Sequence, residues 1–382
     1  MVAPKRTEMW KIALTTSLLV NAVLSVLWLR ALNAASDATS SDTGPLVVVV
    51  TATVESIAQL STETPSPTQT PAATSSATPT PAATATLLST ATPAPSETAT
   101  PAPTGTPLPT PTATEPPTPS WLGYVNRFRD EGGLPFLDED VAWSLGSEAH
   151  SRYTVKTDFI SHSQDASSAW YSQAGLEAAR NGNLAATIWF EAPAEWAIDY
   201  WISAPFHALP MLDPQLQSVG FGWYREQDGG VVFAANMDIL RGLDQDMVDF
   251  SYPITFPRDG GSAWVRQSVL YEYPDPLTAC PNYVRPTGPP IILQLGTGSG
   301  VPAIEGSSFR SGDRVLDHCA FSEATYTNPD ATAQLSGRRI LDVRDAIVLI
   351  PRLPLQPDKV YTASIAVDGQ QITWSFTAVA AP

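Results

Sequence analysis

Histidine is the residue type here best suited to chemistry near neutral pH, because an imidazole can bind a metal ion or transfer a proton. The chain holds four: His150, His162, His207 and His318. Ser161 and Ser163 flank His162, and Asp158 and Asp165 are near in sequence, which is too little to assign a positioning acid. No Gly-x-Ser-x-Gly nucleophile motif occurs. The sequence therefore gives no direct evidence of nucleophilic catalysis.

Only two cysteines are present, Cys280 and Cys319. This number excludes a disulfide-dense scaffold and a cysteine-rich zinc site. His318 stands beside Cys319, but two cysteines and a lone histidine rarely hold a metal outside the cell. We predict a disulfide that closes a loop of about 40 residues and stabilises the fold by roughly 3 to 4 kcal/mol.

Apolar residues at helical spacing predict three helices at the start of the folded region. The first ends near Gly132-Gly133, the second carries an apolar stripe of Val141, Leu145, Ala149 and Tyr153, and the third runs from about 194 to 203. His150 lies beside the second stripe, so we interpret it as a packing histidine. Two strands, 219–224 and 230–236, then flank the turn at 228–230. This order indicates an α+β or layered α/β/α domain.

An ordered set of short motifs runs through the same segment: Asn126-x-x-Arg129-x-x-x-Gly133-Leu134-Pro135, Ala149-His150, His162-Ser163, Trp201-x-Ser203-Ala204-Pro205-x-His207 and Val219-Gly220-x-Gly222. No single motif is specific, but their order resembles the CAP (SCP-like) superfamily of cysteine-rich secretory, antigen 5 and pathogenesis-related proteins. The resemblance implies a CAP-type α-β-α sandwich with a cleft of two histidines and two glutamates that can bind a divalent metal. It places His162 and His207 at the two histidine positions.

The glutamates of that cleft are where this sequence departs from the family. The motif Gly-Glu-Asn-(Leu/Ile)-Ala best matches residues 181–185, which puts Gly182 at the first glutamate, and an alternative register uses Glu177. The second glutamate position holds Ala204. The candidate metal ligands and catalytic residues are therefore His162, His207 and Glu177. Because a catalytic zinc usually has three protein ligands and a water, this set makes a weak zinc site, and we expect no firmly bound cofactor.

The N-terminal residues 1–39 predict the compartment. An apolar run at 9–29 is long enough to span a bilayer, and Lys5 and Arg6 before it place that end in the cytoplasm. We therefore predict a single-pass signal anchor in the cell membrane, with the C-terminal domains extracellular. The alternative is a cleaved signal peptide and secretion. No cysteine follows the run, which excludes a lipoprotein.

Residues 40–120 are dominated by Thr, Pro, Ser and Ala. Such a composition has too little to bury to offset its ordering entropy, so it predicts a disordered, low-complexity stalk. A CAP domain at 121–250 and a second domain at 251–382 complete the predicted organisation.

The sequence of the second domain predicts a β-sandwich. Strands are predicted at 291–295, 346–350, 360–367 and 371–377, the last two around the hairpin turn Asp368-Gly369. Pro354-Leu355-x-Pro357-x-x-x-Tyr361-Thr362, followed by Trp374-Ser375-Phe376-Thr377, resembles the end of bacterial immunoglobulin-like modules. Modules of that kind are usually spacers or adhesion platforms.

The formal net charge of -17 and the pI near 4.5 exclude binding to nucleic acid or to anionic lipid surfaces. We expect a membrane-anchored bacterial surface protein whose CAP domain is a non-catalytic binding or display module for an extracellular ligand, either a lipid, a glycan or a protein. One alternative is a cell-envelope hydrolase or protease that uses His162 and His207 with Glu177. Another is a degenerate structural envelope protein. An enzyme is possible but not favoured, and the sequence leaves the ligand and the oligomeric state open.

Overall fold

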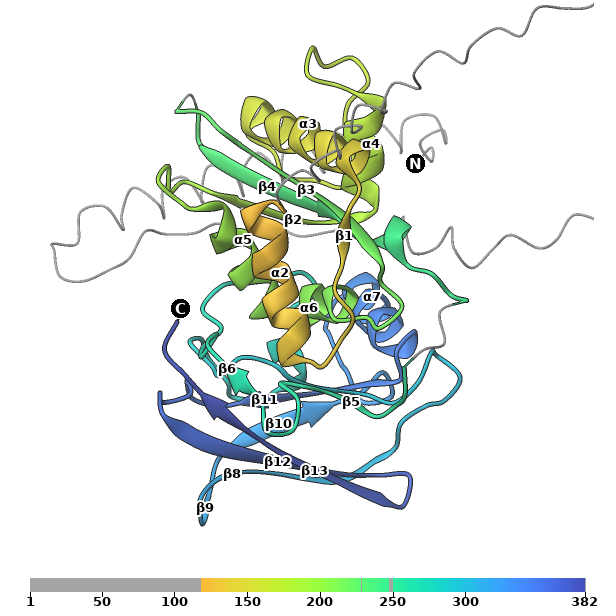
Figure 1. Ribbon diagram of the computed structural model, residues 1–382, viewed down its shortest axis with the longest axis vertical. Helices are drawn as coiled ribbons and strands as arrows, with labels where there is room; N and C mark the ends of the chain where they lie inside the picture. The colour runs from red at the N-terminus through yellow and green to blue at the C-terminus, as the bar shows by residue number, and fades with distance from the viewer. Residues whose placement is uncertain (1–117, 228, 247–249, 382) are drawn as a thin grey trace, which may run out of the picture.

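The computed structural model describes residues 118–227, 229–246 and 250–381. The predicted anchor at 9–29 and nearly all of the predicted stalk lie outside these residues. Among the helices of the described part, none is long and apolar enough to cross a membrane. The described chain is a mixed α+β structure with three sheets (Figure 1).

The first sheet has helices on both faces (Figure 1). Its strand order is β1-β3-β4-β2, with β1 at Asp138–Glu139, β3 at Ser218–Arg225, β4 at Phe233–Asp238 and β2 at Gly182–Thr187. Helices α3 (Val141–Thr157) and α4 (Gln173–Arg180) cover one face, and α2 (Ser120–Glu131), α5 (Ala194–Ile202) and α6 (Pro205–Met211) lie on the other. Helices α2, α3 and α5 and the antiparallel pair β3 and β4 confirm the elements predicted for this segment.

Helix α3 buries only part of the predicted apolar stripe. Tyr153 is 5% exposed, whereas Val141 and Leu145 are 63% and 64% exposed. Small residues face the sheet, because β3 approaches very closely: a Cβ on Gly222 would lie 2.1 Å from the backbone nitrogen of Glu148. Ser151 Oγ donates to the Gly222 carbonyl at 2.9 Å.

The other two sheets face each other across a second hydrophobic core. One has the order β10-β11-β7-β5, with β10 at His318–Phe321, β11 at Ala346–Pro351, β7 at Ile291–Gln294 and β5 at Ile254–Phe256. The other has the order β6-β13-β12-β8-β9, with β6 at Ser262–Ala263, β13 at Gln370–Ala378, β12 at Lys359–Val367, β8 at Ile304–Ser311 and β9 at Arg314–Val315. Short 3-10 turns lie at Leu240–Gly242 and Pro276–Ala279.

The four predicted strands of this segment are confirmed as β7, β11, β12 and β13. Asp368 and Gly369, between β12 and β13, have φ of 50° and 73°, as a two-residue hairpin turn requires. Helix α7 (Ala331–Asp342), between β10 and β11, was not expected from the sequence.

The predicted disulfide is confirmed between Cys280 and Cys319. It joins the end of the 3-10 turn at Pro276–Ala279 to strand β10.

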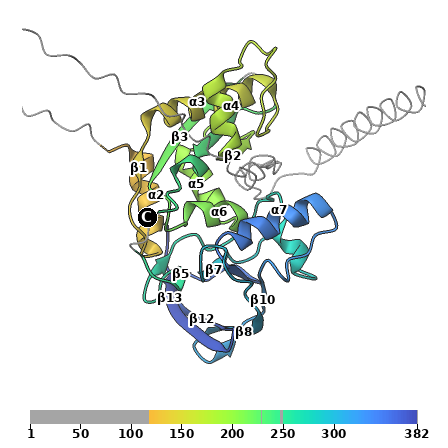
Figure 2. The same ribbon diagram turned by 90° about the vertical axis from the view of Figure 1, so that its right-hand side faces the viewer.

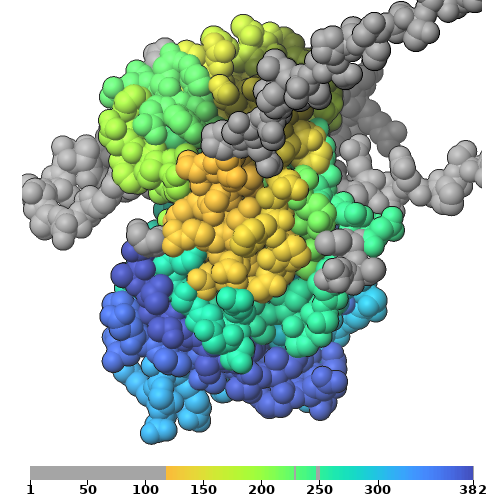
Figure 3. All heavy atoms as spheres, viewed as in Figure 1, coloured from red at the N-terminus to blue at the C-terminus, as the bar shows by residue number. Residues whose placement is uncertain are grey.

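The two segments share one hydrophobic core. Its buried residues run from α2, α5 and α6 to β5, β7, β11 and α7. Phe128 of α2 stacks on Trp264 with ring centroids 4.2 Å apart, and Phe206 of α6 packs edge-on against Tyr326 at 5.1 Å. Figure 3 shows the surface of α2 continuous with both halves of the molecule. The segments on either side of the predicted boundary at 250 are therefore packed as one body, while the boundary itself stays a prediction.

Candidate functional site

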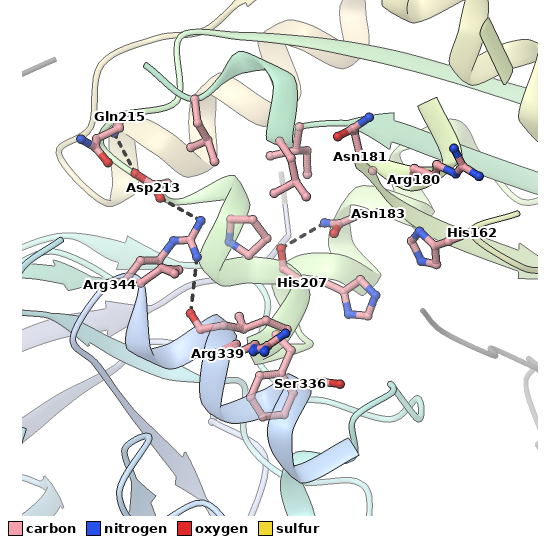
Figure 4. A pocket seen from close by; sticks show the side chains of 18 of the residues that line it. His162, Arg180, Asn181, Asn183, His207, Asp213, Gln215, Ser336, Arg339 and Arg344 are labelled. Carbon is pink, nitrogen blue, oxygen red and sulfur yellow. Dashed lines mark hydrogen bonds and ion pairs between the residues drawn. The ribbon is translucent and has the colours of Figure 1, made fainter. Parts of the chain in front are cut away.

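A cavity of about 490 Å³ lies where α6 and the end of β4 meet α7 (Figure 4). Helices α6 and α7 lie side by side at this junction (Figure 2). It collects residues from both segments, and those with polar side chains are His162, Arg180, Asn181, Asn183, His207, Asp213, Gln215, Gln245, Tyr273, Thr297, Ser336, Arg339 and Arg344. The structure thus brings His162 and His207, 45 residues apart in the numbering of the chain, into one cavity.

His207 is held rigidly at the start of α6. Pro205 occupies the first turn of that helix, and the amide of Asn183 on β2 donates to the His207 carbonyl at 3.0 Å. His207 Nδ1 lies 2.8 Å from Glu272 Oε2, which also accepts from the Phe206 backbone N–H at 3.2 Å. With Nδ1 engaged, Nε2 is the ring nitrogen that remains to meet a molecule in the cavity.

Glu272 is the site residue that the sequence did not reveal. It comes from the second segment, is 6% exposed, and its Oε1 has no hydrogen-bond partner among the described residues. Burial raises the pKa of Glu272 well above its usual range, and burial lowers the pKa of His207 to about 3. Both shifts favour neutral side chains, so the pair adds no net charge to the cavity wall.

His162 has a defined tautomer. Its Nδ1 contacts the carbonyl oxygen of Ala179, which can only accept, so Nδ1 carries the proton and neutral Nε2 carries a lone pair. Nε2 is shielded from solvent and has no partner in the described part of the chain, although the residue as a whole is half-buried. Burial is the main reason that the pKa of His162 falls to about 4; the hydrogen bond to the Ala179 carbonyl opposes this shift, and nearby His207 adds to it. At neutral pH His162 Nε2 is therefore a buried acceptor that has no partner among the described residues.

Glu177 is placed outside the cavity. Its side chain on α4 is 46% exposed, lies 3.6 Å from Arg241 and accepts from the Gln173 amide at 2.9 Å. The two positions where the family carries glutamates do not supply a carboxylate either: Gly182 has no room for a side chain, since a Cβ there would lie 2.5 Å from the Met237 carbonyl, and Ala204 is buried ahead of α6.

Residues 118–227, 229–246 and 250–381 contain no group of three or more His, Cys, Asp or Glu placed to hold a metal ion. Of the predicted set His162, His207 and Glu177, the structure brings the two histidines together and leaves the glutamate apart. The prediction of a possible zinc site stays a prediction.

His150 packs in the interior, in agreement with its interpretation from the sequence. It is 1% exposed, and its Nδ1 accepts from the Gln164 amide at 3.0 Å. Burial lowers its pKa to about 3. It does not line the cavity.

Residues 122–237 match the family model named CAP, the cysteine-rich secretory protein family. Among curated proteins the chain has no significant match. The family match supports the resemblance to the CAP superfamily and covers the first sheet, its helices, and both cavity histidines. Helix α7, which lines the cavity, and Glu272, which contacts the cavity residue His207, lie outside the matched residues.

Proposed function

We propose that this chain is an extracellular, membrane-anchored surface protein whose CAP domain acts as a non-catalytic binding module. The observation that carries the proposal is the cavity between the CAP segment and α7, with an acceptor at His162 and no metal-holding cluster among the described residues. A preformed cavity of this size suits a small molecule. The CAP family match supports a module of the extracellular type.

The absence of a paired nucleophile among the described residues favours binding over hydrolysis. Ser336 is the serine that lines the cavity, and its hydroxyl donates to the Thr332 carbonyl within its own helix at 2.7 Å. Among the described residues no hydrogen bond joins it to either histidine, and the ordinary route to an activated serine needs a base within hydrogen-bond reach.

The test of this function is a hydrolysis assay with the full-length chain in detergent, on a mixed peptide library and on isolated cell wall, with and without added Zn²⁺. We expect product formation no greater than that of a His162→Ala/His207→Ala double variant. Hydrolysis that is abolished in the double variant would replace the binding module with the hydrolase alternative.

We further propose that residues 9–29 anchor the chain in the cell membrane and that residues 40–120 act as a spacer. The apolar run, the preceding positive charges and the Thr/Pro-rich composition support this arrangement. Protease treatment of intact cells should cleave the C-terminal domains, while alkaline carbonate should leave the N-terminal piece in the membrane. Release of the whole chain into the medium would indicate secretion after signal cleavage instead.

We propose that the two facing sheets of the second segment form an immunoglobulin-like module. The support is the long antiparallel pairing of β12 with β8 and β13, packed across a shared core from β7 and β11. This module contributes α7 to the cavity lining and Glu272 to the support of His207, so in this protein it serves as a part of the site as well as a spacer.

A further inference from the structure

The charges that line the cavity differ in sign from those of the chain as a whole. The chain has 38 acidic residues against 21 Lys and Arg, whereas the cavity is lined by Arg180, Arg339 and Arg344 and by one acidic residue, Asp213. Arg344 and Asp213 neutralise each other in a buried ion pair of 2.8 Å. The remaining two arginines leave the cavity with a positive potential in an acidic protein.

Arg339 is the better placed of these two guanidinium groups. It extends from the last turn of α7, is half-buried, and lines the cavity together with His207 of α6, as Figure 4 shows. Arg180, at the end of α4, is exposed at the rim beside the His162 wall. Within the described ranges neither guanidinium has an acidic or hydrogen-bonding partner. A half-buried guanidinium without a partner favours an oxyanion with which it can form two parallel hydrogen bonds.

By exposed area the lining is mostly apolar. Its apolar residues are Phe206, Pro210, Ile239, Leu240, Leu243, Pro274, Ile340 and Val343. These residues belong to both segments, so an apolar body in the cavity would contact both. A bare inorganic anion would leave this surface unfilled, because most of the favourable free energy available here comes from covering apolar area.

We propose that this cavity binds a small organic anion, with its carboxylate or phosphate group on Arg339, attracted also by Arg180, and its apolar body against the wall formed by Phe206, Leu240 and Ile340. This inference rests on the proposed function as a binding module and names the class of ligand. Arg339 lies outside the matched CAP residues, so the anion specificity belongs to the second segment.

The experiment compares matched probes on the full-length chain in detergent by ligand-observed NMR and calorimetry. 2-Naphthoate carries both charge and apolar body, 2-naphthamide has the same shape without the charge, and acetate and inorganic phosphate carry the charge alone. We expect saturable binding of 2-naphthoate at least tenfold tighter than that of 2-naphthamide, and at least tenfold tighter than that of either bare anion. Bare phosphate that binds as tightly as 2-naphthoate would overturn the requirement for an apolar body.

Variants locate the site. Arg339→Gln should weaken 2-naphthoate at least tenfold and leave 2-naphthamide unchanged, Arg339→Lys should recover part of the loss, and Arg180→Gln should weaken 2-naphthoate only a few-fold. Arg314→Gln on the exposed edge strand β9 is the control with the same charge change and should have no effect. Equal thermal unfolding of all variants excludes loss of the fold as the cause.

Equal affinity for 2-naphthoate and 2-naphthamide, unchanged affinity in Arg339→Gln, or no binding of either probe would each overturn the proposed anion site. The first of these outcomes would leave a binding module for neutral ligands, so the proposed function would survive. The hydrolysis assay above is independent of these probes, so its failure is distinguishable from theirs.

Discussion

The two faces of the first sheet are packed by different means. Under α3 the contact is close and polar: Gly222 lies against the helix backbone, and Ser147 Oγ donates to Asn236 Oδ1 at 2.8 Å. On the other face large side chains such as Trp201 and Phe221 join a core that continues into the second segment. The close contact between α3 and β3 leaves no space for a ligand. The cavity lies instead where α6 and the end of β4 meet α7. The cavity thus lies beside the face of the first sheet whose packing the second segment completes.

Arg129 of α2 stabilises the face of the first sheet that packs against the second segment. Its substitution has the largest expected effect on the free energy of unfolding. Its guanidinium is fully buried and donates to the carbonyls of Pro135, Met211, Asp213 and Leu216 at 2.6 to 3.2 Å. Arg129→Met should lower the free energy of unfolding by about 4 kcal/mol, because it leaves these buried carbonyls without donors. Urea unfolding of the full chain measures this. Arg127→Met on the exposed side of α2 is the control, and an equal loss there would show that the buried hydrogen bonds are not the cause.

Gly222 tests the closely packed face. A Cβ at this position would meet backbone atoms of α3, so Gly222→Ala should cost about 3 kcal/mol in unfolding free energy as the helix shifts. Gly123→Ala, where a Cβ has nothing within 4 Å and the residue lies in α2, should stabilise by about 0.5 to 1 kcal/mol instead.

Combining Gly222→Ala with Arg129→Met sharpens the comparison of the two faces. If the faces are independent, the two losses add within about 0.5 kcal/mol. A larger coupling energy in urea unfolding would mean that the sheet transmits strain from one face to the other.

Local patterns were enough to predict much of the fold. Short β-rich runs and the turn Asp368-Gly369 predicted β12 and β13, because a hairpin depends on neighbours in sequence. The buried face of α3 could not be predicted in this way, since it is determined by the glycines of strand β3, about 70 residues away in the sequence. Helix α7 has a local signal, the Asp330 cap on the Ala333 N–H, but small residues on its buried side gave it no apolar stripe.

The residues of the candidate site were also only partly predictable from the sequence. His162 and His207 could be predicted because the order of motifs around them resembles a known family. Glu272 and Arg339 could not, since their roles depend on tertiary contacts between separate segments. The sequence around Glu272 offers one local signal, an acidic residue between two tyrosines in residues 270–274. Nothing in that segment indicates that His207 is its partner.

Glu272 joins the second segment to the cavity residue His207, and its substitution should have the next largest effect on stability. Glu272→Ala leaves buried His207 Nδ1 and the Phe206 N–H without their partner, so we expect a loss of about 2 kcal/mol in unfolding free energy. Glu272→Gln keeps an oxygen and a donor at the same positions and should cost less than about 1 kcal/mol. A glutamine variant as unstable as the alanine variant would show that the charge of the carboxylate, and not its hydrogen bonds, holds the two segments together.

The pH dependence of stability tests the buried state of His162. Its folded pKa of about 4 lies below the ordinary value of 6.5, so the unfolded chain takes up a proton first as pH falls. The contribution of neutral His162 to the free energy of unfolding is complete above about pH 6.5 and is lost progressively down to about pH 4. Between pH 7 and pH 5 this one group should lower the free energy of unfolding by about 2 kcal/mol. Urea unfolding of His162→Gln across this range should therefore show a shallower decline than the parent chain. An equal slope would mean that His162 is solvated and protonates freely in the folded protein, and the cavity would then present a cation where the structure places a lone pair.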